Sequence, residues 1–114
     1  MAEIKRTLKP EIMLEENAQQ FNKLVASGTH PDTAGKNLSD LDLRAFNLST
    51  ADLSGCYMRG ANLSGLDLSG ANLDGASIKN AHISGCLFPR DLSASEIHLS
   101  LTYGTRLRQP DRDE

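Results

Sequence analysis

A repeat with a period of five residues dominates the centre of this 114-residue chain. Every fifth residue from Leu38 to Phe88 is an apolar side chain of medium or large size, without one insertion. The members are Leu38, Leu43, Leu48, Leu53, Met58, Leu63, Leu68, Leu73, Ile78, Ile83 and Phe88. A helix would place apolar residues three and four apart, and a strand would alternate them at two. Neither element explains the pattern.

Each five-residue unit has a second inward position, two residues before the first. It holds Leu41, Phe46, Ala51, Cys56, Ala61, Leu66, Ala71, Ala76, Ala81 and Cys86. The remaining positions are mostly Asn, Asp, Ser, Arg, Lys and Gly, so we expect them to face outward. Turn-forming residues recur two positions after the central one, at Gly55, Gly60, Gly65, Gly70, Gly75, Asn80 and Gly85. Gly and Asn tolerate positive φ. A short strand that turns in the same sense every five residues must coil.

Three consecutive units carry a family resemblance. The segments 61–65, 66–70 and 71–75 read ANLSG, LDLSG and ANLDG. They resemble the pentapeptide-repeat family, whose pattern is A-(D/N)-L-x-x, and the chain is similar to a small bacterial member with flanking capping helices. The resemblance implies an all-β solenoid: a right-handed quadrilateral β-helix of just under three coils, with about twenty residues per coil. The resemblance also implies that an N-terminal and a short C-terminal α-helix cap the solenoid.

The predicted coil has an interior of stacked apolar columns. Residues twenty apart should lie above one another, which distributes bulk among the walls and fills a narrow interior. The predicted structural core comprises Leu43, Phe46, Leu48, Leu53, Met58, Leu63, Leu66, Leu68, Leu73, Ile78 and Ile83. Both ends of so short a stack would expose apolar side chains and unpaired backbone without covers.

The two flanks have the features of such covers. Residues 1–35 are predicted to form a helix and linker, with the helix from about Pro10 to Ser27 and stop signals after it. It caps the first coil or, as the open alternative, binds a partner. Residues 36–90 form the repeat and 91–108 the C-terminal cap, where Ser93 is the expected N-cap and Glu96 the partner in a capping box. Residues 109–114 are predicted to be a disordered tail.

Composition excludes several classes of function. The beginning of the chain has no secretory signal pattern and no stretch is apolar enough to cross a membrane, so we expect a cytoplasmic protein that binds no membrane. The net charge of −3 is evenly spread, which argues against direct nucleic-acid binding. Cys56 and Cys86 lie thirty residues apart, on opposite walls, which disfavours a disulfide. The three histidines have no metal-ligand spacing, so neither a metal, a cofactor nor an enzymatic site is predicted.

Function must then come from the outer surface. The first hypothesis is a non-enzymatic protein–protein interaction or scaffold module with an unidentified protein partner. The candidate partner-binding residues are Asp42, Arg44, Asp52, Tyr57, Arg59, Asp67 and Lys79. Tyr57 replaces the usual Asn or Asp, and exposed tyrosine is favoured at interfaces. The alternative, implied by the family, is a DNA-mimic inhibitor of a DNA-binding protein such as a topoisomerase, with an acidic stripe. A homodimer through an end of the stack or a flanking helix is also left open.

Overall fold

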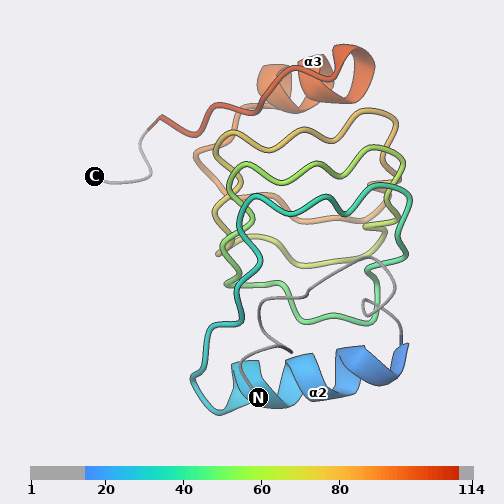
Figure 1. Cartoon of the computed structure of the whole chain (residues 1–114). Coiled ribbons are helices and arrows are strands. Elements are labelled where there is room, and N and C mark those ends of the chain that lie inside the picture. The colour runs from blue at the N-terminus through green and yellow to red at the C-terminus, as the bar shows by residue number, and fades with distance from the viewer. Residues whose placement is uncertain (1–14, 111–114) are drawn as a thin grey trace.

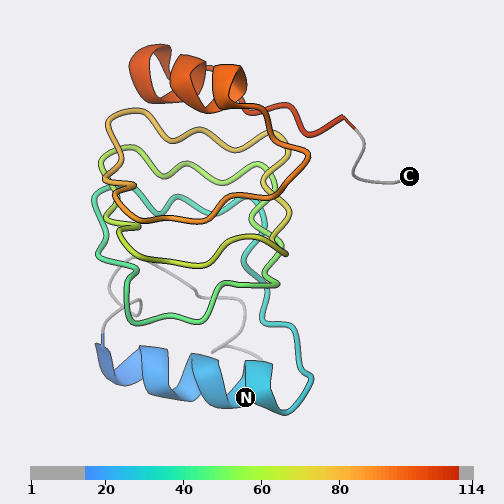
Figure 2. The ribbon, with the colours of Figure 1, turned by 180° about the vertical axis from the view of Figure 1, so that it is seen from behind.

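The structure is a computed structural model that describes residues 15–110. A stack of coils lies between two helices, α2 (Glu15–Ala26) at one end and α3 (Ala94–Tyr103) at the other (Figures 1 and 2). The predicted start of the first helix at Pro10 lies outside the described residues. The chain is therefore a β-solenoid with a helix across each end.

Parallel pairing between coils has a twenty-residue offset. The bridges are Asn37–Tyr57, Asp42–Asn62, Asp52–Asn72, Tyr57–Ser77, Asn62–His82 and Asp67–Leu87. Two backbone hydrogen bonds support each contact: at the first bridge Leu38 N donates to Tyr57 O (2.7 Å) and Tyr57 N to Lys36 O (3.0 Å). Within residues 15–110 the pairing is by isolated bridges, with no longer strand. Four five-residue units therefore separate each residue from the one above it.

A β-turn closes each unit, as in the hydrogen bond from Cys56 N to Leu53 O (3.1 Å). The third turn residue has positive φ at Gly35, Asp40, Gly55, Gly60, Gly65, Gly75, Asn80 and Gly85. Gly70 differs, because its φ lies outside the left-handed region. A Cβ there would lie 2.7 Å from the carbonyl oxygen of Ser49. Close approach of the neighbouring coil, rather than positive φ, therefore requires glycine at this position.

The interior contains the side chains of both inward positions. Of the predicted core, Leu43, Phe46, Leu48, Leu53, Met58, Leu63, Leu66, Leu68, Leu73 and Ile78 are buried. Ile83 was expected to be enclosed but is only half-buried, and the same holds for Phe88. Both lie in the last coil, which has no further coil above it (Figure 1). Leu73 and Ile78 of the same coil are fully buried, because the segment after α3 and α3 itself cover them: Leu73 N donates to Gln109 Oε1 and Ile78 N to Ser100 Oγ. Burial therefore decreases along the final two walls.

Helix α2 covers the first coil. The ring of Phe21 packs edge-on against Phe46, with centroids 5.3 Å apart. The side chain of Asn22 meets backbone groups at the edge of the coil: Nδ2 donates to Ala45 O (2.9 Å), and Oδ1 accepts from Asn47 N (2.7 Å). This amide provides the donor and the acceptor that an adjacent coil would otherwise provide.

Helix α3 has the predicted N-cap, because Ser93 Oγ accepts from Glu96 N (3.1 Å). Gly104 ends the helix in the left-handed conformation. The predicted capping box is wrong in its second half. The Glu96 carboxylate does not return to Ser93 but accepts hydrogen bonds from the backbone N–H and the guanidinium of Arg108. A charged donor outcompetes the backbone N–H for this carboxylate.

The segment after α3 also covers the coil. Leu107 O accepts from Gly75 N and Leu107 N donates to Ala76 O, both at 2.7 Å. The sequence places Gln109 in a disordered tail, but Gln109 is buried and its Oε1 accepts from Leu73 N (2.9 Å). Backbone groups of the coil thus find partners in residues far along the chain, and residues 111–114 lie outside the described part.

Candidate interaction surface

One side of the solenoid combines an exposed aromatic ring with basic side chains. The outward residues of this side, which we call the Tyr57 wall, are Asn37, Ser39, Tyr57, Arg59, Ser77 and Lys79. Bridges pair Tyr57 with Asn37 below and Ser77 above. Arg59 and Lys79 occupy one column, because Gly60 N donates to Lys79 O (2.9 Å) in the same register. The repeat therefore fixes both the ring and the two cations on a single rigid side.

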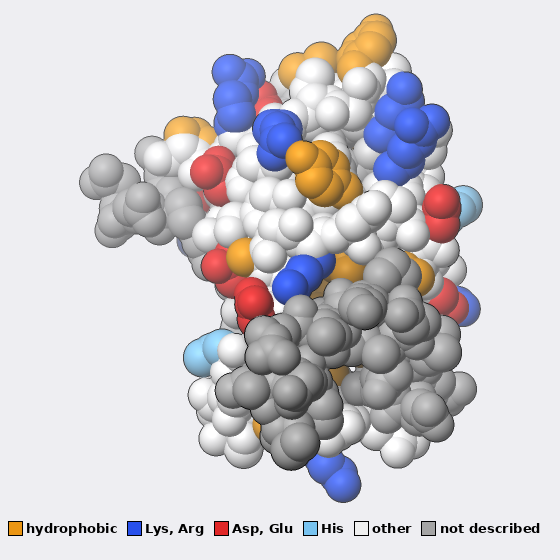
Figure 3. Space-filling model, in the orientation of Figure 1, with side chains coloured by type: hydrophobic (Ala, Val, Ile, Leu, Met, Phe, Trp, Pro, Cys, Tyr) orange, Lys and Arg blue, Asp and Glu red, His pale blue; other side chains and the backbone are white. Residues whose placement is uncertain are grey.

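Arg106, from the segment after α3, lies against this wall. Its guanidinium carbon is 5.4 Å from the centroid of the Tyr57 ring, within the range of a cation–π contact. Nη2 donates to the Tyr57 hydroxyl (2.8 Å) and Nη1 to Gly75 O (3.1 Å). Tyr57 nevertheless keeps 45 % of its surface exposed. Figure 3 shows a face where basic side chains lie on either side of an exposed hydrophobic one.

Three basic residues on this side lack an acidic partner among the described residues. Ion pairs join Lys36 to Asp32, Arg44 to Asp42 and Arg108 to Glu96. Arg59, Lys79 and Arg106 form none within residues 15–110. The surface around Tyr57 is therefore locally positive although the whole chain has a net charge of −3.

Asp42 and Arg44 form an exposed pair on the neighbouring wall. Arg44 Nε donates to Asp42 Oδ1 (2.9 Å) and Nη2 to Oδ2 (2.8 Å). These bonds, together with one from the Arg44 backbone N–H, lower the pKa of Asp42 to about 2. The two opposite charges thus neutralise one another, and the pair adds little net charge to the surface.

The other predicted carboxylates are engaged in turns. Asp52 Oδ1 accepts from Ser54 Oγ (2.6 Å), and Asp67 Oδ1 accepts from Ser69 Oγ (2.7 Å), which lowers the pKa of Asp67. The bridges place Asp42, Asp52 and Asp67 in three different columns. These residues therefore do not line up as one acidic stripe.

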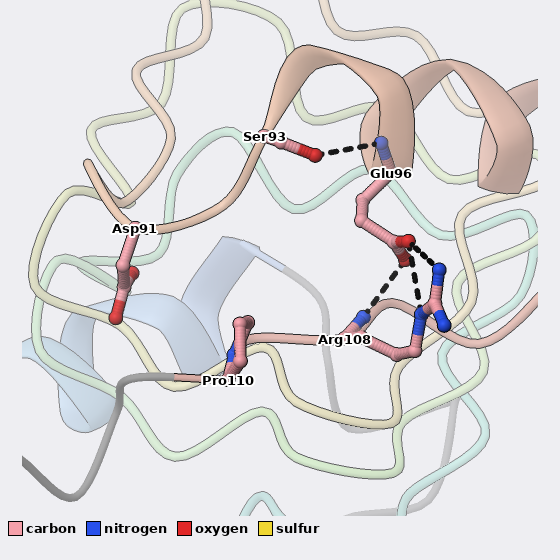
Figure 4. A pocket seen from close by; sticks show the side chains of 5 residues that line it. All are labelled: Asp91, Ser93, Glu96, Arg108 and Pro110. Carbon is pink, nitrogen blue, oxygen red and sulfur yellow. Dashed lines mark hydrogen bonds and ion pairs between the residues drawn. The ribbon is translucent and has the colours of Figure 1, made fainter.

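A hollow of about 260 Å³ lies beside α3, lined by Asp91, Ser93, Glu96, Arg108 and Pro110 (Figure 4). Glu96 and Arg108 point toward one another, and the guanidinium hydrogen bonds lower the pKa of the Glu96 carboxyl. A carboxylate held ionised by an arginine is a poor proton donor or acceptor near neutral pH. The contact is consistent with a structural role in holding the C-terminal segment.

Both cysteines are free thiols. Burial raises the pKa of Cys56, and burial together with the charge of Asp67 raises that of Cys86 to about 11. Such thiols are weak nucleophiles because little thiolate is present near neutral pH. Within the described part of the chain, no group of three His, Cys, Asp or Glu side chains could hold a metal ion.

Arg106 is the residue of this surface that sequence reasoning did not identify. It lies outside the five-residue repeat, and its partner Tyr57 is 49 positions earlier. A spacing rule has no reason to connect the two. The only signal was that Tyr57 departs from the Asn or Asp of its position.

Comparisons with known proteins agree with the repeat. Residues 37–75 and 51–88 match the family model described as pentapeptide repeats, with eight copies. No curated protein and no solved structure matches the chain. None of the helices in the described residues has the length and apolar character needed to span a membrane.

Proposed function

Because the chain belongs to the pentapeptide-repeat family over residues 37–88, we propose that it is a non-enzymatic module that binds a protein partner through the Tyr57 wall. The observation that carries this proposal is the half-exposed tyrosine flanked by Arg59 and Arg106. Tyrosine and arginine are enriched at protein interfaces and among the residues that dominate binding energy.

The proposal includes the finer features of the scaffold. We take the solenoid to be a right-handed, four-sided β-helix of just under three coils, formed by residues 36–90. The twenty-residue bridge offset supports four five-residue units per coil. Residues 1–35 and 91–108 act as caps in this proposal, and the free thiols support a cytoplasmic location.

The rigidity of the Tyr57 wall favours binding, because little conformational entropy is lost when a partner binds to it. The backbone N–H of Tyr57 donates to Lys36 O in the coil below, and its chain neighbours Cys56 and Met58 both bond Ser77 in the coil above. Its hydroxyl is held by Arg106. A preorganised surface pays less conformational entropy on association than a mobile loop.

The test is affinity capture from lysate of the source cell with three baits. They are the wild-type protein, Tyr57→Ala, and Leu87→Ala, which removes an exposed apolar side chain from a different column. We expect a protein that wild type and Leu87→Ala retain and Tyr57→Ala loses. Equal retention by all three baits would refute the role of the Tyr57 wall. Recovery of a DNA-binding protein that duplex DNA releases would support the DNA-mimic alternative instead.

A further inference from the structure

We infer that the Tyr57 wall recognises an extended acidic segment of a protein. One carboxylate would meet Arg106, and another would meet the column of Arg59 and Lys79. The inference rests on the proposed function and names the chemistry of the partner.

The first support is charge. Arg106 contacts the Tyr57 ring, Arg59 follows Tyr57 by two residues and Lys79 lies above Arg59, and none of the three forms an ion pair within residues 15–110. Asp40 lies next to this column, since its N–H donates to Arg59 O (2.8 Å), but its side chain forms no ion pair within residues 15–110. Opposite charge on a partner would therefore gain attraction without breaking a pair.

The second support is the fixed position of Arg106. Two of its N–H groups are bound by neutral acceptors, Gly75 O and the Tyr57 hydroxyl. A guanidinium has five N–H donors in a planar fork, so others remain for a carboxylate. Because the fork is already held, binding costs little side-chain entropy.

The third support is the arrangement along the wall. Arg106 bonds Gly75 O and the Tyr57 hydroxyl, while Arg59 follows Tyr57 by two residues in the same unit, so cations flank the ring. In an extended partner alternate side chains share one face, so alternate carboxylates can all face this wall.

A protein segment fits these observations better than nucleic acid. The wall offers three cations, Arg59, Lys79 and Arg106, rather than a long basic track, and the chain as a whole has a net charge of −3. Binding to a polyphosphate backbone depends on many simultaneous cation contacts. Few, well-placed cations favour a short acidic segment.

The experiment is a titration of the isotope-labelled protein, observed by two-dimensional NMR, with a twelve-residue peptide of alternating Glu and Thr. The variant is Arg59→Gln. Its matched control is Arg90→Gln, which removes an exposed cation that also lacks an ion pair in the described residues and lies in another column. A Gln–Thr peptide and single-stranded dT12 serve as probe controls.

We expect shifts around Tyr57 and Arg59, and binding that weakens about threefold to fivefold in Arg59→Gln but not in Arg90→Gln. Equal weakening in both variants, or equal binding of the Gln–Thr peptide, would overturn the inference. Tighter binding of dT12 than of the acidic peptide would replace it with a nucleic-acid site. If no acidic peptide binds while the Tyr57-dependent partner is still captured from lysate, the inference fails and the proposed function stands.

Discussion

Replacing Leu63 by alanine is the most direct perturbation of the solenoid interior. Leu63 is fully buried, and backbone bonds connect its unit to the coils on both sides, from Leu43 N to Asn62 O and from Leu63 N to His82 O. Three carbon atoms are removed, which costs about 2.4 kcal/mol in transfer free energy at about 0.8 kcal/mol each. The cavity adds to this cost because hydrogen-bonded coils above and below limit collapse. We expect a total loss of about 3–4 kcal/mol.

The assay is urea unfolding followed by circular dichroism, with Asn62→Ala as the matched control on the outer surface. Asn62 Oδ1 accepts one bond, from Ser64 N (3.1 Å), so its loss should cost only about 1 kcal/mol. Ile83→Ala should lie between the two, because Ile83 is half-buried. Equal losses for Leu63→Ala and Asn62→Ala would refute the assignment of inward and outward positions.

Three further predictions concern single sites. Arg44→Gln should raise the pKa of Asp42 from about 2 toward its ordinary value of 3.8, as measured by NMR titration of the carboxyl. Because the pKa of Asp42 is lower in the folded than in the unfolded protein, the stabilisation by this pair is complete above about pH 4 and is lost as the pH falls through about 2. An unchanged pKa of Asp42 in the variant would refute this. Gly70→Ala should cost about 1–3 kcal/mol in urea unfolding, since its Cβ would lie 2.7 Å from Ser49 O, and a neutral effect would contradict the close approach. Cys86 should react slowly with a thiol reagent at pH 8 and rapidly after unfolding, because its pKa is about 11; fast labelling of the folded protein would contradict this.

The interior was readable from the sequence because the repeat is local. The residue types within each five-residue unit indicate which positions face inward and which face outward, so no distant contact is needed to assign residues such as Leu63 or Leu68. The match to the pentapeptide-repeat family confirms the resemblance. The half-burial of Ile83 could not be predicted from the repeat, because the five-residue period does not show how the last units are covered.

The caps were only partly readable. Apolar stripes and the Ser93 N-cap indicated two helices, but the groups that close the coil edges are single polar side chains. Asn22 bonds a residue 23 positions away, and Gln109 bonds one 36 positions away. The coil groups bonded in this way, Ala45 O and Leu73 N, belong to the backbone, which is the same in every residue, although Gln109 Nε2 also donates to Asp91 Oδ1 (3.0 Å). No pattern of side chains could therefore have identified them. Arg106 was missed for a different reason, because its partner Tyr57 lies 49 positions earlier and a five-residue rule does not connect the two.

The bonds at the two ends set a rule for how this protein can change in length. Asn22 is matched to the corner that contains Ala45 and Asn47, while Gln109 and Leu107 are matched to Leu73 and Gly75. Inserting a whole coil of twenty residues between these corners would return every column to its place and leave both caps in register. Inserting a single unit of five would rotate one cap by one wall relative to the other and misalign all of these contacts. The molecule can therefore be lengthened only in steps of a full turn, a constraint that any natural or engineered variant with both caps must respect.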